Sequence, residues 1–102
     1  MADNTDSVFR ALADETRRAI VDELSVRDAQ TLFSLCVALI ERHGSSITRQ
    51  AISKHLAMLE EAGIVRTEWR GRTKIHHLDL EPIRRAHRSW MGRYTNEKDT
   101  GA

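Results

Sequence analysis

Along the first part of the chain, apolar residues recur every three or four positions, which is the spacing of helices with one buried face. The first such stretch predicts a short helix that begins at a capping Asp6 or Ser7 and ends at residue 13 or 14. Asp14 can in turn cap a second helix, which fades near Val26. The apolar faces consist of Val8, Phe9 and Leu12 in the first helix and of Ala19, Ile20 and Leu24 in the second.

Two further helices follow, and only a short turn separates them. Thr31 can cap the first of them, which runs to His43, and Gly44 is a suitable left-handed stop. Thr48 can cap the second, which ends at Gly63. Because so short a connection joins them, the pair predicts a helix-turn-helix. Their apolar faces consist of Leu32, Leu35, Cys36, Leu39 and Ile40, and of Ile52, Leu56 and Leu59.

After Gly63 the pattern changes to that of β-strands. Two runs, Ile64–Trp69 and Thr73–Leu80, are rich in β-branched and aromatic residues and flank a basic tip at residues 70–72, which predicts a β-hairpin. Pro82 opens a last helix, whose apolar side carries Ile83, Ala86, His87, Trp90, Met91 and Tyr94. The order α-α-α-α-β-β-α is that of a winged helix-turn-helix, a mainly α fold with a β-hairpin wing, and it points toward DNA.

Length and composition narrow the classes of protein. The 102 residues suffice for one domain and exclude a multi-domain enzyme. One cysteine cannot form an internal disulfide, no secretion signal opens the chain, and the most apolar stretch, Leu32–Ile40, is far shorter than the span of about 20 residues that crosses a bilayer. We expect a cytoplasmic protein without membrane contact, folded as one domain within residues 1–102, with disordered tails at residues 1–4 and 96–102.

The formal net charge of +1 does not by itself indicate a nucleic-acid binder, but the charges are unevenly placed. Residues 49–77 hold six Lys or Arg against three Asp or Glu, whereas residues 1–30 hold four against seven. The basic segment coincides with the fourth helix and the hairpin. This asymmetry is expected of a protein that turns one side toward phosphate.

The outer face of the fourth helix carries side chains suited to base edges, because its apolar positions turn inward. Arg49 can make bidentate hydrogen bonds to guanine, and Gln50 can make them to adenine. The basic hairpin can bind backbone phosphates or enter a minor groove. His55 lies at the edge of the apolar stripe, so a phosphate contact and a packing role both stay open. The predicted DNA-binding residues are Thr48, Arg49, Gln50, Ser53, Lys54, His55, Arg70, Arg72 and Lys74. A merely solvated, charged hairpin is the alternative for the last three.

Three runs of sequence resemble the ArsR-type winged-helix transcriptional regulators. They are LADETRRAI at residues 12–20, QAISKHL at residues 50–56 followed by Leu59 and EAGIV, and the pair Gly71-Arg72. The resemblance implies a homodimer that binds an inverted-repeat operator in double-stranded DNA and represses a nearby promoter or its own. The third helix is longer here than the first motif helix of typical relatives.

Many members of that family sense metals, through paired cysteines on the third helix or through Asp and His ligands on the last one. Cys36 lacks a second cysteine, His87 lacks a second histidine at suitable spacing, and His76 and His77 point to opposite faces of a strand. We therefore predict a branch of the family without a metal site, no cofactor, and an unknown effector. A metal- or redox-responsive role for Cys36 is the alternative, although a free cysteine on an apolar stripe usually behaves as a buried hydrophobe.

The first and last helices offer more apolar surface than a small helix-turn-helix core needs. Packing within the protomer is one explanation, and a two-fold dimer interface is the one that the resemblance favours. The predicted interface residues are Val8, Phe9, Leu12, Ile83, Ala86, Trp90, Met91 and Tyr94.

Two other classes of protein compete with a DNA-binding regulator. A winged helix can be a protein-interaction module, in which case residues 49–54 would bind an acidic partner. An enzyme is disfavoured, because Ser45 and Ser46 lack a visible base and orienting acid and no Gly-rich phosphate loop is present. We therefore predict no catalytic residue.

Overall fold

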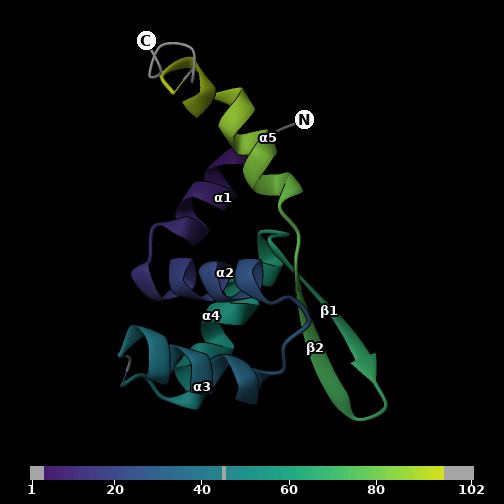
Figure 1. The fold of residues 1–102 in the computed structure, drawn as a ribbon. Helices are drawn as coiled ribbons and strands as arrows, with labels where there is room; N and C mark the ends of the chain where they lie inside the picture. Colours follow the sequence, from purple (N-terminus) through teal and green to yellow (C-terminus); the bar gives the residue numbers. More distant parts are fainter. Residues whose placement is uncertain (1–3, 45, 96–102) are drawn as a thin grey trace.

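The computed structural model describes residues 4–44 and 46–95. The predicted disordered tails lie outside the described residues, except for Asn4. The element order confirms the predicted winged helix-turn-helix, mainly α with a β-hairpin wing (Figure 1). The elements are α1 (Thr5–Leu12), α2 (Glu15–Val26), α3 (Leu32–His43), α4 (Arg49–Glu61), β1 (Val65–Arg70), β2 (Thr73–Leu78), α5 (Glu81–Ser89) and the 3-10 helix η1 (Met91–Arg93).

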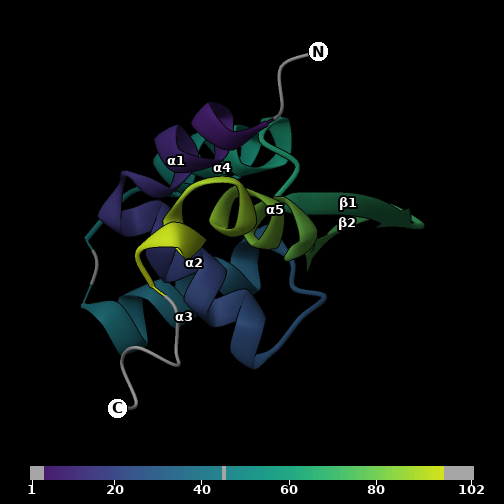
Figure 2. The ribbon, with the colours of Figure 1, turned by 90° about the horizontal axis from the view of Figure 1, so that it is seen from above.

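The helices are arranged around α2, which crosses the middle of the molecule (Figure 1). At one end α1 packs against α5, and at the other end α3 and α4 form the helix-turn-helix. Seen from above, the hairpin projects away from the helices (Figure 2). One core joins all these elements, and its buried apolar residues are Val8, Ala11, Ile20, Leu24, Leu35, Leu39, Ile52, Leu56, Leu59, Ala62, Ile64, Val65 and Ala86.

Three of the predicted caps start their helices. A side-chain oxygen accepts a hydrogen bond from the backbone N–H three residues on, which satisfies a donor that the first helical turn leaves unpaired. The distances are 3.0 Å from Asp14, 3.1 Å from Thr31 and 3.1 Å from Thr48. Gly44, with φ of 61°, ends α3 in the left-handed conformation as expected.

The first helix begins earlier than predicted. Neither Asp6 nor Ser7 caps it, since both lie within α1. The Asn4 carbonyl accepts the first helical hydrogen bond, from Val8 N at 3.0 Å. The Asn4 side chain does not cap the helix but donates to Ala62 O at 2.7 Å, which ties the start of α1 to the end of α4.

Two further expectations were wrong in detail. The last helix does not run on to Tyr94: α5 ends at Ser89, because Trp90 leaves helical geometry, with φ of −143° and ψ of −59°, and packs its ring edge-on against Phe9. Ile40 does not share the buried face of α3 but is 54% exposed. The buried stripe follows Leu35 and Leu39, and a side chain one position further lies about 100° around the helix.

The hairpin is antiparallel and is anchored at its base. Its register runs from Val65 opposite Leu78 to Arg70 opposite Thr73, and Gly71 in the two-residue turn has φ of 62°, a left-handed value that suits glycine. The edge of β2 that does not pair with β1 exchanges two backbone hydrogen bonds with Gln30, at 2.8 and 3.1 Å. The loop between α2 and α3 therefore holds the wing.

Candidate nucleic-acid interface

The outer face of α4 lies where the sequence predicts it. Ile52, Leu56 and Leu59 are buried against the core, so the other side of the first two turns faces solvent. The exposed residues of that side are Thr48, Arg49, Gln50, Ser53 and Lys54. A guanidinium, an amide, two hydroxyls and an ammonium are thus presented at the start of a helix whose inner face is packed against the core, which is what base-edge recognition requires.

His55 differs from these residues because it has partners inside the protein. Its Nδ1 lies 3.2 Å from a terminal nitrogen of Arg17 and 3.8 Å from Asp14 Oδ2. Its side chain is only 20% exposed. Of the two roles that the sequence left open for His55, this geometry favours packing between α4 and the start of α2.

The wing carries its predicted cations on the surface. Arg70, Arg72 and Lys74 are all exposed. Arg70 lies 3.0 Å from a Glu68 carboxylate oxygen, and Lys74 lies 4.0 Å from one of Glu60. Arg72 makes no ion pair within the described part of the chain, so its charge is the one most available to a phosphate.

A groove of about 500 Å³ separates the wing from the helix-turn-helix. Arg49, Ser53 and Glu60 line it from α4, and Trp69, Arg72 and Lys74 line it from the wing. The first two residues of α3 also line it. We call this feature the wing groove. It brings together residues of α4 and of the hairpin tip that the sequence assigned to separate parts of one interface.

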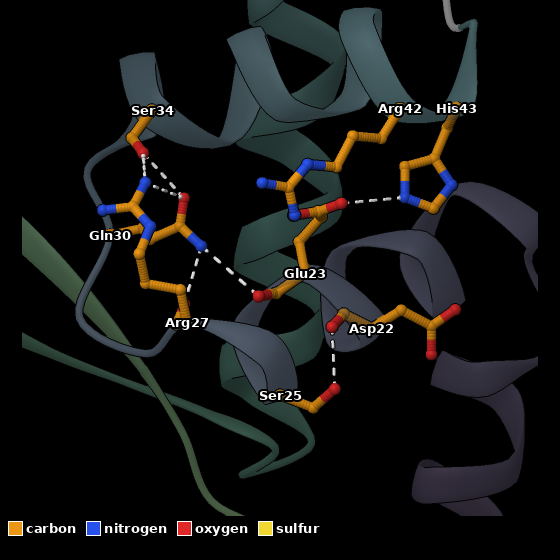
Figure 3. A network of polar contacts seen from close by, with 8 residues as sticks. All are labelled: Asp22, Glu23, Ser25, Arg27, Gln30, Ser34, Arg42 and His43. Carbon is orange, nitrogen blue, oxygen red and sulfur yellow. Dashed lines mark hydrogen bonds and ion pairs between the residues drawn. The ribbon is translucent and has the colours of Figure 1, made fainter.

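Polar contacts that the sequence analysis missed hold α3 against α2 (Figure 3). The carboxylate of Glu23 is almost fully buried, and its two oxygens lie 3.2 Å from Arg42 and 3.1 Å from His43. At the other end of α3, Ser34 donates to Gln30 Oε1 at 2.6 Å. Because α3 and α4 pack together, these ties help to set the position of α4.

A second missed cluster fastens the wing to the loop after α2. His77 on β2 makes hydrogen bonds to Asp28 Oδ2, at 3.0 Å, and to Glu68 on β1, while Leu78 N donates to Asp28 Oδ1 at 2.7 Å. The hydrogen bonds to Asp28 and then to Glu68 raise the pKa of His77 above its usual value. Those of His77 and then Arg70 lower the pKa of Glu68. Burial acts to raise the pKa of Asp28, but hydrogen bonds from Leu78 and His77 outweigh it and lower that pKa.

These directions predict how the attachment of the wing depends on pH. A raised histidine pKa gives stability that is complete below its unfolded value of 6.5 and is lost as the pH rises through the folded value. The lowered pKa values of the two carboxyls act in the other direction. They stabilise the fold above the pH of the unfolded pKa, which is 3.8 for Asp28 and 4.5 for Glu68, and this stability is lost at lower pH. We therefore expect wild-type stability to fall more than that of His77→Gln between about pH 6 and about pH 9 in thermal unfolding. Parallel curves would show that His77 does not act as a charged clamp.

Cys36 lies half-buried on α3. Burial raises the pKa of its thiol, although the charge of Arg49 acts in the opposite direction. A raised pKa keeps the sulfur protonated, and the thiolate is the form that binds metals and reacts with oxidants. Within residues 4–44 and 46–95, no group of three or more His, Cys, Asp or Glu side chains is placed to hold a metal ion. No helix of that part of the chain is both long and apolar enough to cross a membrane.

The predicted dimer residues fall into two groups. Val8 and Ala86 are 1% and 2% exposed, so they belong to the core of the protomer itself. The face that remains available consists of Phe9, Leu12 and Ile83, which are half-buried, and of Trp90, Met91 and Tyr94, which are exposed. Between α1 and α5 this face encloses an apolar pocket of about 310 Å³.

A firmly packed helix with a polar outer face, beside a basic β-hairpin, defines the class of protein as a winged helix-turn-helix protein that binds duplex DNA. Comparison with known proteins agrees. Residues 12–68 match the helix-turn-helix domain family. The chain is 44% identical over 91 residues to the uncharacterized HTH-type transcriptional regulator YuzN of Bacillus subtilis (strain 168), a match that covers 89% of this chain and 99% of YuzN.

Similar solved structures show which helix-turn-helix family the chain resembles. An ArsR-like transcriptional regulator from Rhodococcus sp. RHA1 is 34% identical, with a TM-score of 0.71 and coverage of 95% of this chain and 84% of that one. The crystal structure of another ArsR family transcriptional regulator is 28% identical, with a TM-score of 0.72 and coverage of 94% and 91%. The chain belongs to the ArsR-type family of winged helix-turn-helix transcriptional regulators. It is therefore a DNA-binding regulator of transcription and not an enzyme.

Proposed function

We propose that this regulator is a homodimeric repressor that binds an inverted-repeat operator at a nearby promoter or its own. The observation that carries the proposal is the outward face of α4, where Arg49, Gln50, Ser53 and Lys54 are exposed beside the basic wing. In this proposal α4 enters the major groove, Arg72 on the wing binds the backbone or the minor groove, and the protein works in the cytoplasm, where its DNA is. No effector, metal or other cofactor is part of the proposal.

The exposed apolar face of α1, α5 and η1 supports the dimer. Aromatic residues and methionine are enriched in the cores of protein interfaces, and Trp90, Met91 and Tyr94 are exposed here. A two-fold dimer places two copies of α4 on one side of a duplex, about 34 Å apart if the half-sites are one helical turn apart. Such a dimer requires an operator with two-fold symmetry.

Two measurements test this proposal. Genome-wide capture of the bound DNA is expected to yield an inverted repeat, and deletion of the gene is expected to raise expression of a reporter driven by that promoter. A fall in reporter expression would show an activator instead. If no duplex resists competitor DNA while an acidic protein binds residues 49–54, the chain is a protein-interaction module.

Replacing Arg49 or Arg72 by alanine is expected to change DNA binding in two different ways. Arg49→Ala removes a base contact, so discrimination between the operator and a changed base pair falls by about 1–3 kcal/mol. Arg72→Ala removes a phosphate contact, so all sequences lose affinity about equally and the slope of log K against log salt becomes shallower by about one. Gel shifts over a salt series measure both effects, and equal loss of discrimination in the two variants contradicts these roles.

A further inference from the structure

Two large aromatic side chains lie exposed in the wing groove. Trp69 on β1 is 65% exposed and Phe33 in the first turn of α3 is 69% exposed, and both line the groove. Neither side chain is part of the hydrophobic core. Two exposed aromatic rings that line one groove beside charged side chains form a candidate binding surface.

The same groove is positively charged. Arg49, Arg72 and Lys74 line it together with one acid, Glu60. That acid is already engaged, because Thr67 donates to it at 3.0 Å and Lys74 lies 4.0 Å away. Arg49 and Arg72 therefore remain as the cations that can meet an anion, beside two apolar rings.

One strand of duplex DNA can match both the cations and the apolar rings of the groove, because its anionic phosphates alternate with largely apolar deoxyribose rings. A helix in the major groove and a wing at the adjacent minor groove stand on either side of one sugar–phosphate strand. The wing groove lies between that helix and that wing, because residues of both line it. Its charge and its apolar surface both fit this strand.

We propose that Trp69 and Phe33 pack against deoxyribose rings of the strand that enters the wing groove, while Arg49 and Arg72 lie at its bases and phosphates. The proposal rests on the proposed function, and it adds two apolar positioning residues to an interface that the sequence described only by its polar side chains. These rings set the distance between α4 and the wing on the duplex.

Alanine variants test the apolar contacts against the ionic ones. We expect Trp69→Ala and Phe33→Ala each to weaken operator binding about tenfold, without a change in the slope of log K against log salt, because no charge is lost. Trp69→Phe keeps an apolar ring and is expected to recover most of the affinity. Ile40→Ala is the matched control, since Ile40 is 54% exposed on α3 and does not line the groove. Thermal unfolding of every variant shows whether its fold is intact.

Fluorine NMR places the contact at Trp69 directly. Protein labelled with 5-fluorotryptophan has resonances from Trp69 and Trp90, and the one absent from Trp69→Phe belongs to Trp69. We expect saturating operator DNA to shift that resonance, and poly-glutamate to leave it unchanged. An unshifted Trp69 resonance, or full operator affinity in folded Trp69→Ala, overturns the proposal but leaves the proposed function intact. A resonance that shifts with poly-glutamate but not with DNA indicates an acidic protein partner, and it overturns both this proposal and the proposed function. A wild-type protein that binds no duplex DNA also overturns both.

Discussion

Replacing Arg17 by alanine is expected to lower the free energy of unfolding by about 3 kcal/mol, the largest loss that we expect from any single polar side chain of this protein. Arg17 is 9% exposed and lies where three helices meet. Its Nε donates to Ala11 O at 2.6 Å, and one terminal nitrogen donates to Arg10 O at 3.3 Å. The alanine variant leaves these carbonyls at the end of α1 without their charged donor.

The same guanidinium also reaches α4. Its other terminal nitrogen lies 3.2 Å from His55 Nδ1 and 3.3 Å from the sulfur of Met58, both on α4. Arg17 therefore connects α1, which belongs to the proposed dimer face, with α4, which belongs to the proposed DNA face. Losing this connection adds to the expected cost.

The neighbouring Arg18 is the matched control for Arg17. It also donates to a carbonyl at the end of α1, Leu12 O at 2.8 Å, but this contact is exposed. Because exposed polar contacts contribute little, we expect Arg18→Ala to change the free energy of unfolding by less than about 0.5 kcal/mol. Urea unfolding of both variants measures the difference. Equal losses would show that burial of Arg17 is not what makes it important.

The elements of the fold were predictable wherever local chemistry decides them. Asp14, Thr31 and Thr48 act as caps because each places an oxygen near an unpaired backbone N–H, and such a rule needs only neighbouring residues. The end of α5 was not predictable in this way. It depends on Trp90, whose ring meets Phe9 from the other end of the chain at a centroid distance of 6.2 Å.

The candidate site shows the same division. The outer face of α4 follows from its own buried stripe, so the sequence predicts which side chains are exposed there. Contacts between helices depend on how the helices cross, and the ties of Glu23 to α3 and of Arg17 to α4 were missed for that reason. One signal was available: both residues fall at helical spacing from Ile20, on the buried face of α2, where a charged side chain needs a partner.

The wing groove was also beyond sequence analysis, because residues of four elements, α3, α4, β1 and β2, line it. The period of the strand indicates which residues share a face with Trp69, but not that Phe33 lines the same groove. In the sequence, Trp69 and Phe33 are ordinary residues of a strand and of a helix. Only the folded structure shows that they line one groove with Arg49 and Arg72. The exposure of the polar side chains of α4 was predictable, whereas the meeting of Trp69 and Phe33 in one groove was not.

Replacing Met91 by aspartate is expected to dissociate the proposed dimer and to weaken operator binding about 100-fold or more. Met91 lines the apolar pocket between α1 and α5 and is 39% exposed, so a protomer can accommodate a charge there by keeping it in water. A two-fold interface cannot, because it would bury two unpaired carboxylates. A monomer then binds one half-site without the gain of about 10²–10⁴ that linkage to a second half-site provides.

Val26→Asp is the control for Met91→Asp. Val26 is 74% exposed at the end of α2 and does not line the pocket, so the same change of charge there is expected to leave both the dimer and the operator affinity within about twofold. Analytical ultracentrifugation gives the mass of each variant, and a gel shift with whole and half operators gives its affinity. A Met91→Asp variant that stays dimeric rules out this face as the interface. If it becomes monomeric and keeps full affinity, then each protomer reads its site alone, and the two-fold operator is no longer required.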